Sequence, residues 1–182
     1  MCGIAGILDI TSAPERSLIE KMSRIMQHRG PDGEGYFIGG PAALGHRRLS
    51  IIDLEGGRQP MSNEDDTVWI TYNGEVYNFL ELKKDLIGKR HRFKTKSDTE
   101  TIVHAYEEYG TRCVEKLRGM FAFGIWDARE KKLLLARDRL GKKPLYYYSD
   151  GKKFVFASEL KAILQDRKIK REINTNAIAD YL

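Results

Sequence analysis

The chain opens with Met1-Cys2-Gly3-Ile4-Ala5-Gly6-Ile7-Leu8, a short apolar run that carries a cysteine at its second position. Removal of Met1 would put a thiol and a free α-amine on the same residue. An α-amine has a pKa of about 7.7–8.0 and a free cysteine a pKa of about 8.5, so proton transfer between the two groups is nearly balanced at neutral pH. The run therefore suggests a strand that presents Cys2 as a nucleophile with its own base, although residue type alone favours a small buried hydrophobe.

The composition is that of one soluble globular domain, because the 182 residues are 41% hydrophobic and 31% charged. The apolar run at the start is short, is interrupted by Gly3, Gly6 and Asp9, and has no basic leader, so it predicts neither a signal peptide nor a membrane span. We therefore expect a cytoplasmic protein that keeps Cys2 and Cys113 as reduced thiols.

The formal net charge of +5 raises the question of nucleic-acid binding. The lysines, however, occur as scattered pairs among acidic residues, and the only dense basic run, residues 167–171, has no interleaved aromatic side chains. Nucleic-acid binding is therefore not expected. A contact with another domain or partner suits the basic run better.

Helical patterns occur at three places. Ser12 and Glu15 have the spacing of a capping box, and they precede a helix that should end near Gly30. Its apolar face would comprise Leu18, Met22, Ile25 and Met26. Two further helices are predicted at residues 79–88, with Leu82 and Leu86 inward, and at residues 98–109, with Ile102, Val103 and Tyr106 inward and Gly110 as the stop.

Short strands surround these helices. They are predicted at residues 3–8, 35–38, 42–47, 49–52 and 67–73, and again in a meander at 120–126, 132–137, 145–148 and 154–157, with a hairpin turn at Asp150-Gly151. Gly3 and Gly6 would let another backbone approach the first strand closely. Strands, then helices, then strands imply an α+β fold with two mainly antiparallel sheets and helices outside.

The last residues predict a boundary. Asn174 has the character of a helix cap, and residues 177–182 would begin a helix. We therefore expect one domain at residues 1–165, followed by residues 166–182 as a linker and the start of a helix that leads to a further domain.

Seven motifs in order carry a resemblance that covers essentially the whole chain. They are CGIAG (residues 2–6), HRGPDGEG (28–35), GHRRLSI (45–51), YNGEVYN (72–78), KSDTE (96–100), LRGMFAF (117–123) and ARDRLGKKPLYY (136–147). Together they resemble the glutaminase domain of class II glutamine amidotransferases, and within that class the glutamine-hydrolysing asparagine synthetases. The resemblance implies the four-layer αββα sandwich of N-terminal nucleophile hydrolases.

The same resemblance implies a catalytic set. Cys2 would attack the side-chain amide of glutamine, and the Asn73 side chain and the Gly74 backbone N–H would form the oxyanion hole. An activated nucleophile and an anion-stabilising pocket are what hydrolysis of an unreactive amide through a thioester requires. On the residues alone, Asn73-Gly74 favours a type I′ hairpin turn, and the other motifs reverse this preference.

Free glutamine needs a cation for its α-carboxylate and an anion for its α-ammonium, and the resemblance assigns these roles to Arg48 and Asp98. Arg47 is the positional alternative, because adjacent side chains on a strand face opposite ways and only one arginine can enter the pocket. Asp98 has a second reading as an acidic residue that favours the positive end of its own helix. The resemblance completes the pocket with Glu75 and the backbone of Leu49, Ser50, Ile51 and Ile52.

The remaining histidines, cysteine and glycines indicate no further site. The four histidines, His28, His46, His91 and His104, show no ligand spacing, so no metal site is expected. Cys113 is read as a structural thiol. The glycines between residues 33 and 40 lack the ending and context of a phosphate-binding loop, so no cofactor is expected on this chain.

The resemblance implies hydrolysis of L-glutamine to glutamate and ammonia through a Cys2 thioester, with the ammonia passed to an ATP-dependent synthetase domain that makes asparagine from aspartate. ATP and magnesium would then be needed only by that C-terminal domain. Two alternatives stay open: amidation of a different acceptor, and a non-catalytic glutamine-binding domain. A homodimer is also left open.

Overall fold

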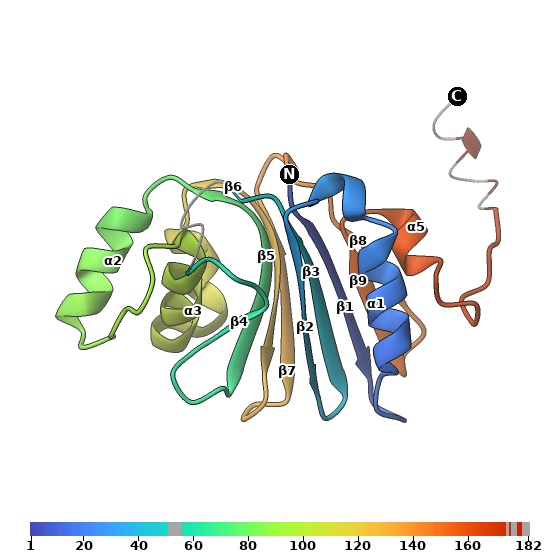
Figure 1. The fold of residues 1–182 in the computed structure, drawn as a ribbon, viewed down its shortest axis with the longest axis horizontal. Helices are drawn as coiled ribbons and strands as arrows, with labels where there is room; N and C mark the ends of the chain where they lie inside the picture. Colours follow the sequence, from blue (N-terminus) through green and yellow to red (C-terminus); the bar gives the residue numbers. More distant parts are fainter. Residues whose placement is uncertain (51–55, 174, 176–177, 180–182) are drawn as a thin grey trace.

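The computed structural model describes residues 1–50, 56–173, 175 and 178–179. Two antiparallel sheets pack face to face, and helices cover both outer faces (Figure 1). The resulting order of layers is helix, sheet, sheet, helix. This is the αββα sandwich that the sequence predicts.

Each sheet is assembled from strands that are distant in the sequence. The first sheet has the strand order β2 (Gly33–Gly39), β3 (Ala42–Arg48), β1 (Gly3–Asp9), β9 (Lys153–Ala157) and β8 (Tyr146–Ser149). The second has the order β4 (Met61–Ser62), β5 (Val68–Val76), β6 (Gly119–Asp127) and β7 (Lys132–Arg137). Strands β1 and β5 lie inside their sheets, and the ends that matter here pair on one side, Gly3 with Arg47 of β3 and Asn73 with Ala122 of β6.

The helices divide between the two outer faces. Helices α1 (Arg16–Arg24) and α5 (Leu160–Ile163) cover the first sheet, and α2 (Phe79–Gly88), α3 (Asp98–Tyr109) and α4 (Cys113–Lys116) cover the second (Figure 1). Short 3-10 turns occupy Gln27–Arg29 and Gly110–Arg112. The predicted bounds of α2 and α3 are confirmed, and their predicted inward residues Leu82, Leu86, Ile102, Val103 and Tyr106 are buried.

The two sheets meet closely at Phe156, which is fully buried. A Cβ added at Gly6 would lie 2.1 Å from the ring atom Cε1 of Phe156, and one added at Gly124 would lie 2.4 Å from its Cζ. Glycine at both positions leaves room for the aromatic ring. The prediction that Gly6 admits another backbone is therefore wrong in detail, because the close neighbour is a side chain.

The predicted capping box of the first helix is also wrong. Helix α1 begins at Arg16 with Glu15 as its N-cap and no side-chain capping bond, and it ends at Arg24 rather than near Gly30. Ser12 instead binds Asp9, which accepts the Ser12 backbone N–H at 3.1 Å and the Ser12 hydroxyl at 3.2 Å. The competing Asp9 turn thus takes the polar groups that the box would have used.

The predicted meander is divided between the sheets, because β6 and β7 belong to the second sheet while β8 and β9 belong to the first. The crossing segment after β7 is organised by Asp138, whose carboxylate accepts backbone N–H groups of Leu140, Lys142 and Lys143 at 2.9–3.2 Å. A fourth bond, from the N–H of Phe121 at 3.2 Å, ties the crossing to β6. The hairpin at Asp150-Gly151 is confirmed between β8 and β9.

Three further expectations concern segment ends. Leu49 and Ser50 follow β3 without forming a strand, while residues 51 and 52 of that predicted strand lie outside the described residues. The predicted helix start at Asn174 and residues 177–182 falls largely outside them as well. The boundary at residue 165 stays a prediction, although Asp166 binds Lys153 at 2.6 Å and Ile169 packs in the core beside α1. Within the described part of the chain, no helix has the length and apolar character needed to cross a membrane.

Candidate active site

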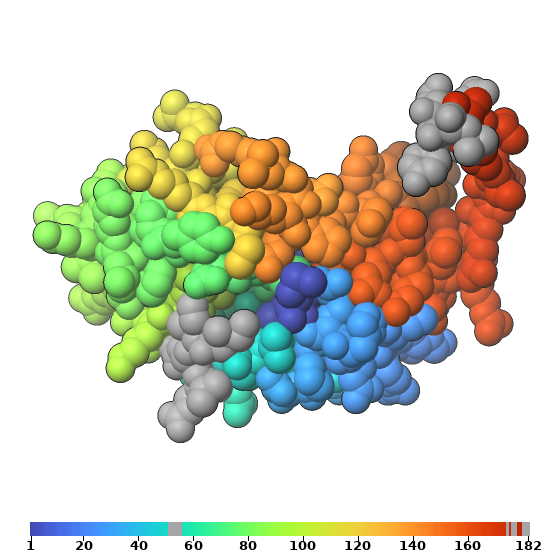
Figure 2. All heavy atoms as spheres, turned by 90° about the horizontal axis from the view of Figure 1, so that it is seen from above, coloured from blue at the N-terminus to red at the C-terminus, as the bar shows by residue number. Residues whose placement is uncertain are grey.

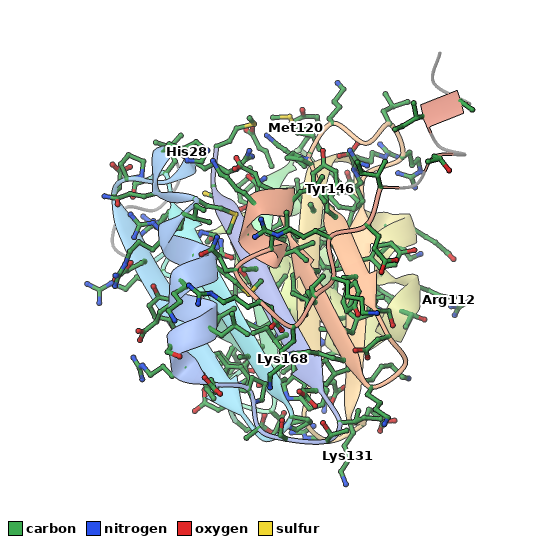
Figure 3. All side chains as sticks on the ribbon, turned by 90° about the vertical axis from the view of Figure 1, so that its right-hand side faces the viewer. His28, Arg112, Met120, Lys131, Tyr146 and Lys168 are labelled. Atoms are coloured by element: carbon green, nitrogen blue, oxygen red, sulfur yellow. The ribbon has the colours of Figure 1, made fainter. Side chains whose placement is uncertain are left out.

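A cavity of about 310 Å³ lies where the N-terminus meets the ends of both sheets. It brings together seven of the residues predicted from the sequence: Cys2, Arg48, Leu49, Asn73, Gly74, Glu75 and Asp98. Figure 2 shows the N-terminal segment at the centre of this face. In Figure 3, Met120, another lining residue, lies at the same end of the sheets as His28 and opposite Lys131. The volume falls at the lower end of the range usual for small-molecule pockets.

The thiol of Cys2 lies against the chain that leaves β3. The backbone N–H of Leu49 points at Sγ from 3.4 Å, and the Leu49 carbonyl lies 3.6 Å from the same sulfur. The Cys2 backbone is fixed separately, because Arg29 donates from Nε to its carbonyl oxygen at 3.0 Å. Arg29 is itself held by Glu159, 3.1 Å from its Nη1. These contacts constrain where the Cys2 thiol, the candidate nucleophile, can point.

Asn73 and Gly74 lie inside strand β5, opposite Ala122 and Phe121 of β6. The hairpin-turn reading of this pair is therefore wrong. Asn73 is buried, yet its Nδ2 has no hydrogen-bond partner within the described chain. A buried donor without a partner is uncommon and calls for an explanation, and here it lines the cavity. A side chain at position 74 would meet the Met120 carbonyl oxygen at 2.4 Å, so only glycine fits.

The two adjacent arginines point to different surroundings. Arg47 is buried, donates from Nε to the Gly30 carbonyl at 3.1 Å, and pairs through Nη1 with Glu34. Arg48 lines the cavity that contains Cys2. The alternation along β3 thus puts Arg48, and not Arg47, beside the candidate nucleophile.

Asp98 begins helix α3 but does not cap it. The cap is Ser97, whose hydroxyl accepts the N–H of Thr99 at 3.2 Å. The Asp98 carboxylate instead accepts from the Tyr72 hydroxyl at 2.6 Å and from the Val76 N–H at 3.0 Å, and it lines the cavity. A carboxylate in the first turn of α3 also interacts favourably with the positive end of the helix dipole. The predicted role in the pocket and the predicted role at the helix start are therefore compatible.

Of the remaining predicted pocket residues that the structure describes, only Glu75 lines the cavity. Glu75 is exposed. Ser50 is not among its lining residues, and its N–H binds Asp32 Oδ2 at 2.8 Å. Ile51 and Ile52 lie outside the described residues.

The cavity is also lined by Met1 and by residues that sequence reasoning did not single out, namely Gly57, Gln59, Tyr72, Ser97, Thr99, Met120 and Lys143. Four of the quoted motifs include Tyr72, Ser97, Thr99, Met120 and Lys143, but the motifs mark only the segments and not the contacts of these residues. Gln59 lies outside every quoted motif. It reaches the site through side-chain bonds to Tyr72 and Thr99, which no local pattern reveals.

Elsewhere, the fold gathers His91, His104 and Glu107 so that their potential ligand atoms lie within 4.8 Å of one another. Burial opposes the charged form of His104, but Glu100 and Glu107 outweigh it and raise the pKa of His104 to about 9. A proton and a metal ion compete for the same imidazole lone pair, so the raised pKa of His104 opposes metal binding at this group. Both cysteines are free, and burial raises the pKa of the Cys113 thiol to about 11.

The comparison with models of protein families agrees with the fold and with the residues that line this cavity. The chain belongs to the glutamine amidotransferase domain family, whose model matches residues 1–182. This domain is thus a glutamine amidotransferase.

Its relatives are longer proteins. It is 43% identical over 186 residues to glutamine-hydrolyzing asparagine synthetase 1 of Bacillus subtilis (strain 168), covering 100% of this chain and 29% of the relative. It is 47% identical over 170 residues to the glutamine-hydrolyzing asparagine synthetase of Zea mays, covering 91% of this chain and 28% of the relative. The chain thus spans under a third of the length of either relative.

A solved structure shows the same fold at lower identity. The glutamine phosphoribosylpyrophosphate amidotransferase from B. subtilis superimposes with a TM-score of 0.74 at 24% identity, over 89% of this chain and 43% of that chain.

Proposed function

We propose that this domain hydrolyses L-glutamine to glutamate and ammonia through a thioester on Cys2, after removal of Met1. The observation that carries the proposal is the presence, in one cavity, of the Cys2 thiol and of the Asn73 Nδ2 donor, which has no hydrogen-bond partner among the described residues. A nucleophile and a donor for the developing oxyanion are the two parts that acyl transfer needs. Met1 lines the same cavity, so its removal would both enlarge the space and free the α-amine of Cys2.

The chemistry then runs in two halves. Sγ forms a bond to the amide carbon while the thiol proton passes to the α-amine, and the negative oxygen is held by Asn73 Nδ2 and the Gly74 N–H. The C–N bond breaks as the α-ammonium returns the proton to the leaving nitrogen, which departs as ammonia. Water then adds to the thioester carbon, the C–S bond breaks, and glutamate leaves with the thiol restored.

Recognition of free glutamine would use the charged residues of the cavity. Arg48 suits the α-carboxylate, because a guanidinium offers two parallel donors. Asp98 and Glu75 suit the α-ammonium. Arg48 lies at the end of β3 and Asp98 at the start of α3, and both line the cavity that Asn73 lines. We retain the Leu49 backbone as part of this site, since it already contacts the cysteine sulfur.

The ammonia would serve a second domain. Since relatives extend well beyond the matched region and are named asparagine synthetases, we propose an ATP-dependent synthetase domain that amidates aspartate, with another carboxylate acceptor as the alternative. ATP and magnesium would belong to that domain. We keep the cytoplasm as the compartment, and a homodimer stays a prediction.

The test combines labelling with mass spectrometry. Treatment with 6-diazo-5-oxo-norleucine, an electrophilic glutamine analogue, should add one label to Cys2 in chains that have lost Met1, and ammonia release from glutamine should accompany it. Cys2→Ala should lose both while its thermal unfolding is unchanged. Glutamine turnover by Cys2→Ala would refute the mechanism, and glutamine binding without label or turnover would indicate a non-catalytic glutamine-binding domain.

A further inference from the structure

Two groups of one strand hold the Asp98 carboxylate. The Tyr72 hydroxyl donates to its Oδ2 at 2.6 Å, and the Val76 N–H donates to the same oxygen at 3.0 Å. Both donors belong to β5, which also carries Asn73 and Gly74. The carboxylate at the start of α3 is therefore fixed in position relative to Asn73 and Gly74, the two residues proposed to bind the oxyanion.

The tyrosine is suited to be a donor. It is 3% exposed, and burial together with the neighbouring Asp98 charge raises the pKa of Tyr72 well above its usual value of 10. The phenol thus stays protonated across the physiological range. Among the described residues, the hydrogen bonds to Asp98 both reach Oδ2, so Oδ1 is the oxygen left for a ligand in the cavity.

Gln59 adds a second bridge between the same elements. Its Oε1 accepts the Tyr72 backbone N–H at 2.7 Å, and its Nε2 donates to the Thr99 hydroxyl at 3.3 Å. One amide side chain thus links β5, beside Tyr72, to α3, beside Asp98. Gln59, Tyr72 and Thr99 all line the cavity.

We infer that Tyr72 and Gln59 are positioning residues that orient Asp98 toward the α-ammonium of the substrate and so set the preference for free glutamine over amides that lack this group. The inference rests on the proposed function, because it concerns the same site. It assigns the preference to the bridge between β5 and α3 rather than to the Asp98 charge alone. A hydrogen bond to a charged acceptor is among the stronger ones, so its loss should be measurable.

The experiment compares L-glutamine with glutaramic acid, which keeps the carboxylate and the amide but has no α-ammonium. For the intact protein, kcat and KM are measured for both amides, and affinities for both are measured by calorimetry in a Cys2→Ala background. Tyr72→Phe should weaken kcat/KM and affinity for L-glutamine by about tenfold or more, mainly through KM, and change those for glutaramic acid by less than about twofold. Gln59→Met should also lower the ratio of kcat/KM for L-glutamine to kcat/KM for glutaramic acid.

Tyr106→Phe is the matched control. Tyr106 is also buried and donates to a carboxylate, Asp127 Oδ2 at 3.1 Å, but it does not line the cavity. It should leave the ratio between the two amides unchanged. Equal losses for both amides in Tyr72→Phe, or an unchanged ratio, would overturn the inference. Since calorimetry needs no turnover, a protein that binds L-glutamine selectively without hydrolysing it would contradict the proposed catalysis and still decide the role of Tyr72.

Discussion

Arg29 donates from Nε to the backbone carbonyl of Cys2 across 3.0 Å, so a side chain 27 positions away fixes the candidate nucleophile. The guanidinium is nearly buried and also pairs with Glu159 at 3.1 Å. A lysine could satisfy one of these partners but not both in the same geometry.

Arg29→Lys should therefore lower kcat for glutamine hydrolysis by about 10- to 100-fold with little change in KM, because the thiol is displaced while the substrate contacts remain. Steady-state kinetics checks this. Arg139→Lys is the control, since Arg139 also donates to a carbonyl, that of Leu117 at 3.3 Å, away from Cys2. Equal kcat values for the two variants would contradict the positioning role of Arg29.

Asn73→Ala should separate activity from stability. Because Nδ2 of Asn73 has no partner in the described chain, its removal breaks no hydrogen bond from that atom, but it deletes the proposed oxyanion donor and should lower kcat by ~10²–10³. Asn63→Ala is the opposite case. Asn63 Oδ1 accepts the N–H groups of Thr67 and Val68 at 3.0 and 3.1 Å, so its loss should reduce stability by about 1–3 kcal/mol and spare kcat. Kinetics and urea unfolding of both variants test the pair.

The two thiols should differ in reactivity. Cys113 is fully buried and its pKa is raised to about 11, whereas Cys2 lines an open cavity. Only the thiolate is nucleophilic, so iodoacetamide at pH 7.5 should label Cys2 alone in the native protein and both cysteines in guanidinium. Peptide mapping measures this. Labelling of Cys113 in the native protein would show that its burial is incomplete in solution.

How far the sequence predicts this fold depends on the range of each interaction. Helices α2 and α3 were predicted to the residue, because their apolar periodicity and the Gly110 stop are local signals. The capping box failed because Asp9, outside the window, competes for Ser12. The meander failed because strand alternation does not say which sheet a strand joins.

The residues of the candidate site also fall into those that motifs predicted and those that only the structure revealed. Cys2, Arg48, Asn73, Gly74 and Asp98 were found through motifs, and the cavity contains all five. Tyr72 and Gln59 were missed because their importance lies in bonds to Asp98 and Thr99, which are 26 and 40 positions away. Contacts over such separations depend on the packing of β5 against α3, which local patterns do not encode.

Two buried histidines should limit stability on opposite sides of neutrality. The pKa of His104 is raised from 6.5 to about 9, because Glu100 and Glu107 outweigh its burial. The folded state therefore holds a proton that the unfolded state loses between pH 6.5 and 9, so stability falls as the pH rises through this window, by up to ~1.4 kcal/mol per pH unit.

His46 has the opposite sign. Burial, with Arg48 and Arg47 nearby, lowers its pKa to about 3. As the pH falls below 6.5, the unfolded state therefore binds a proton that the folded state does not, and stability decreases. Urea unfolding at a series of pH values should show that His104→Gln flattens the slope between pH 7 and 9 and that His46→Gln leaves it intact. His46→Gln should instead weaken the loss of stability between pH 6 and 4. If His104→Gln retains the full alkaline slope, the carboxylates around His104 do not hold its proton in solution.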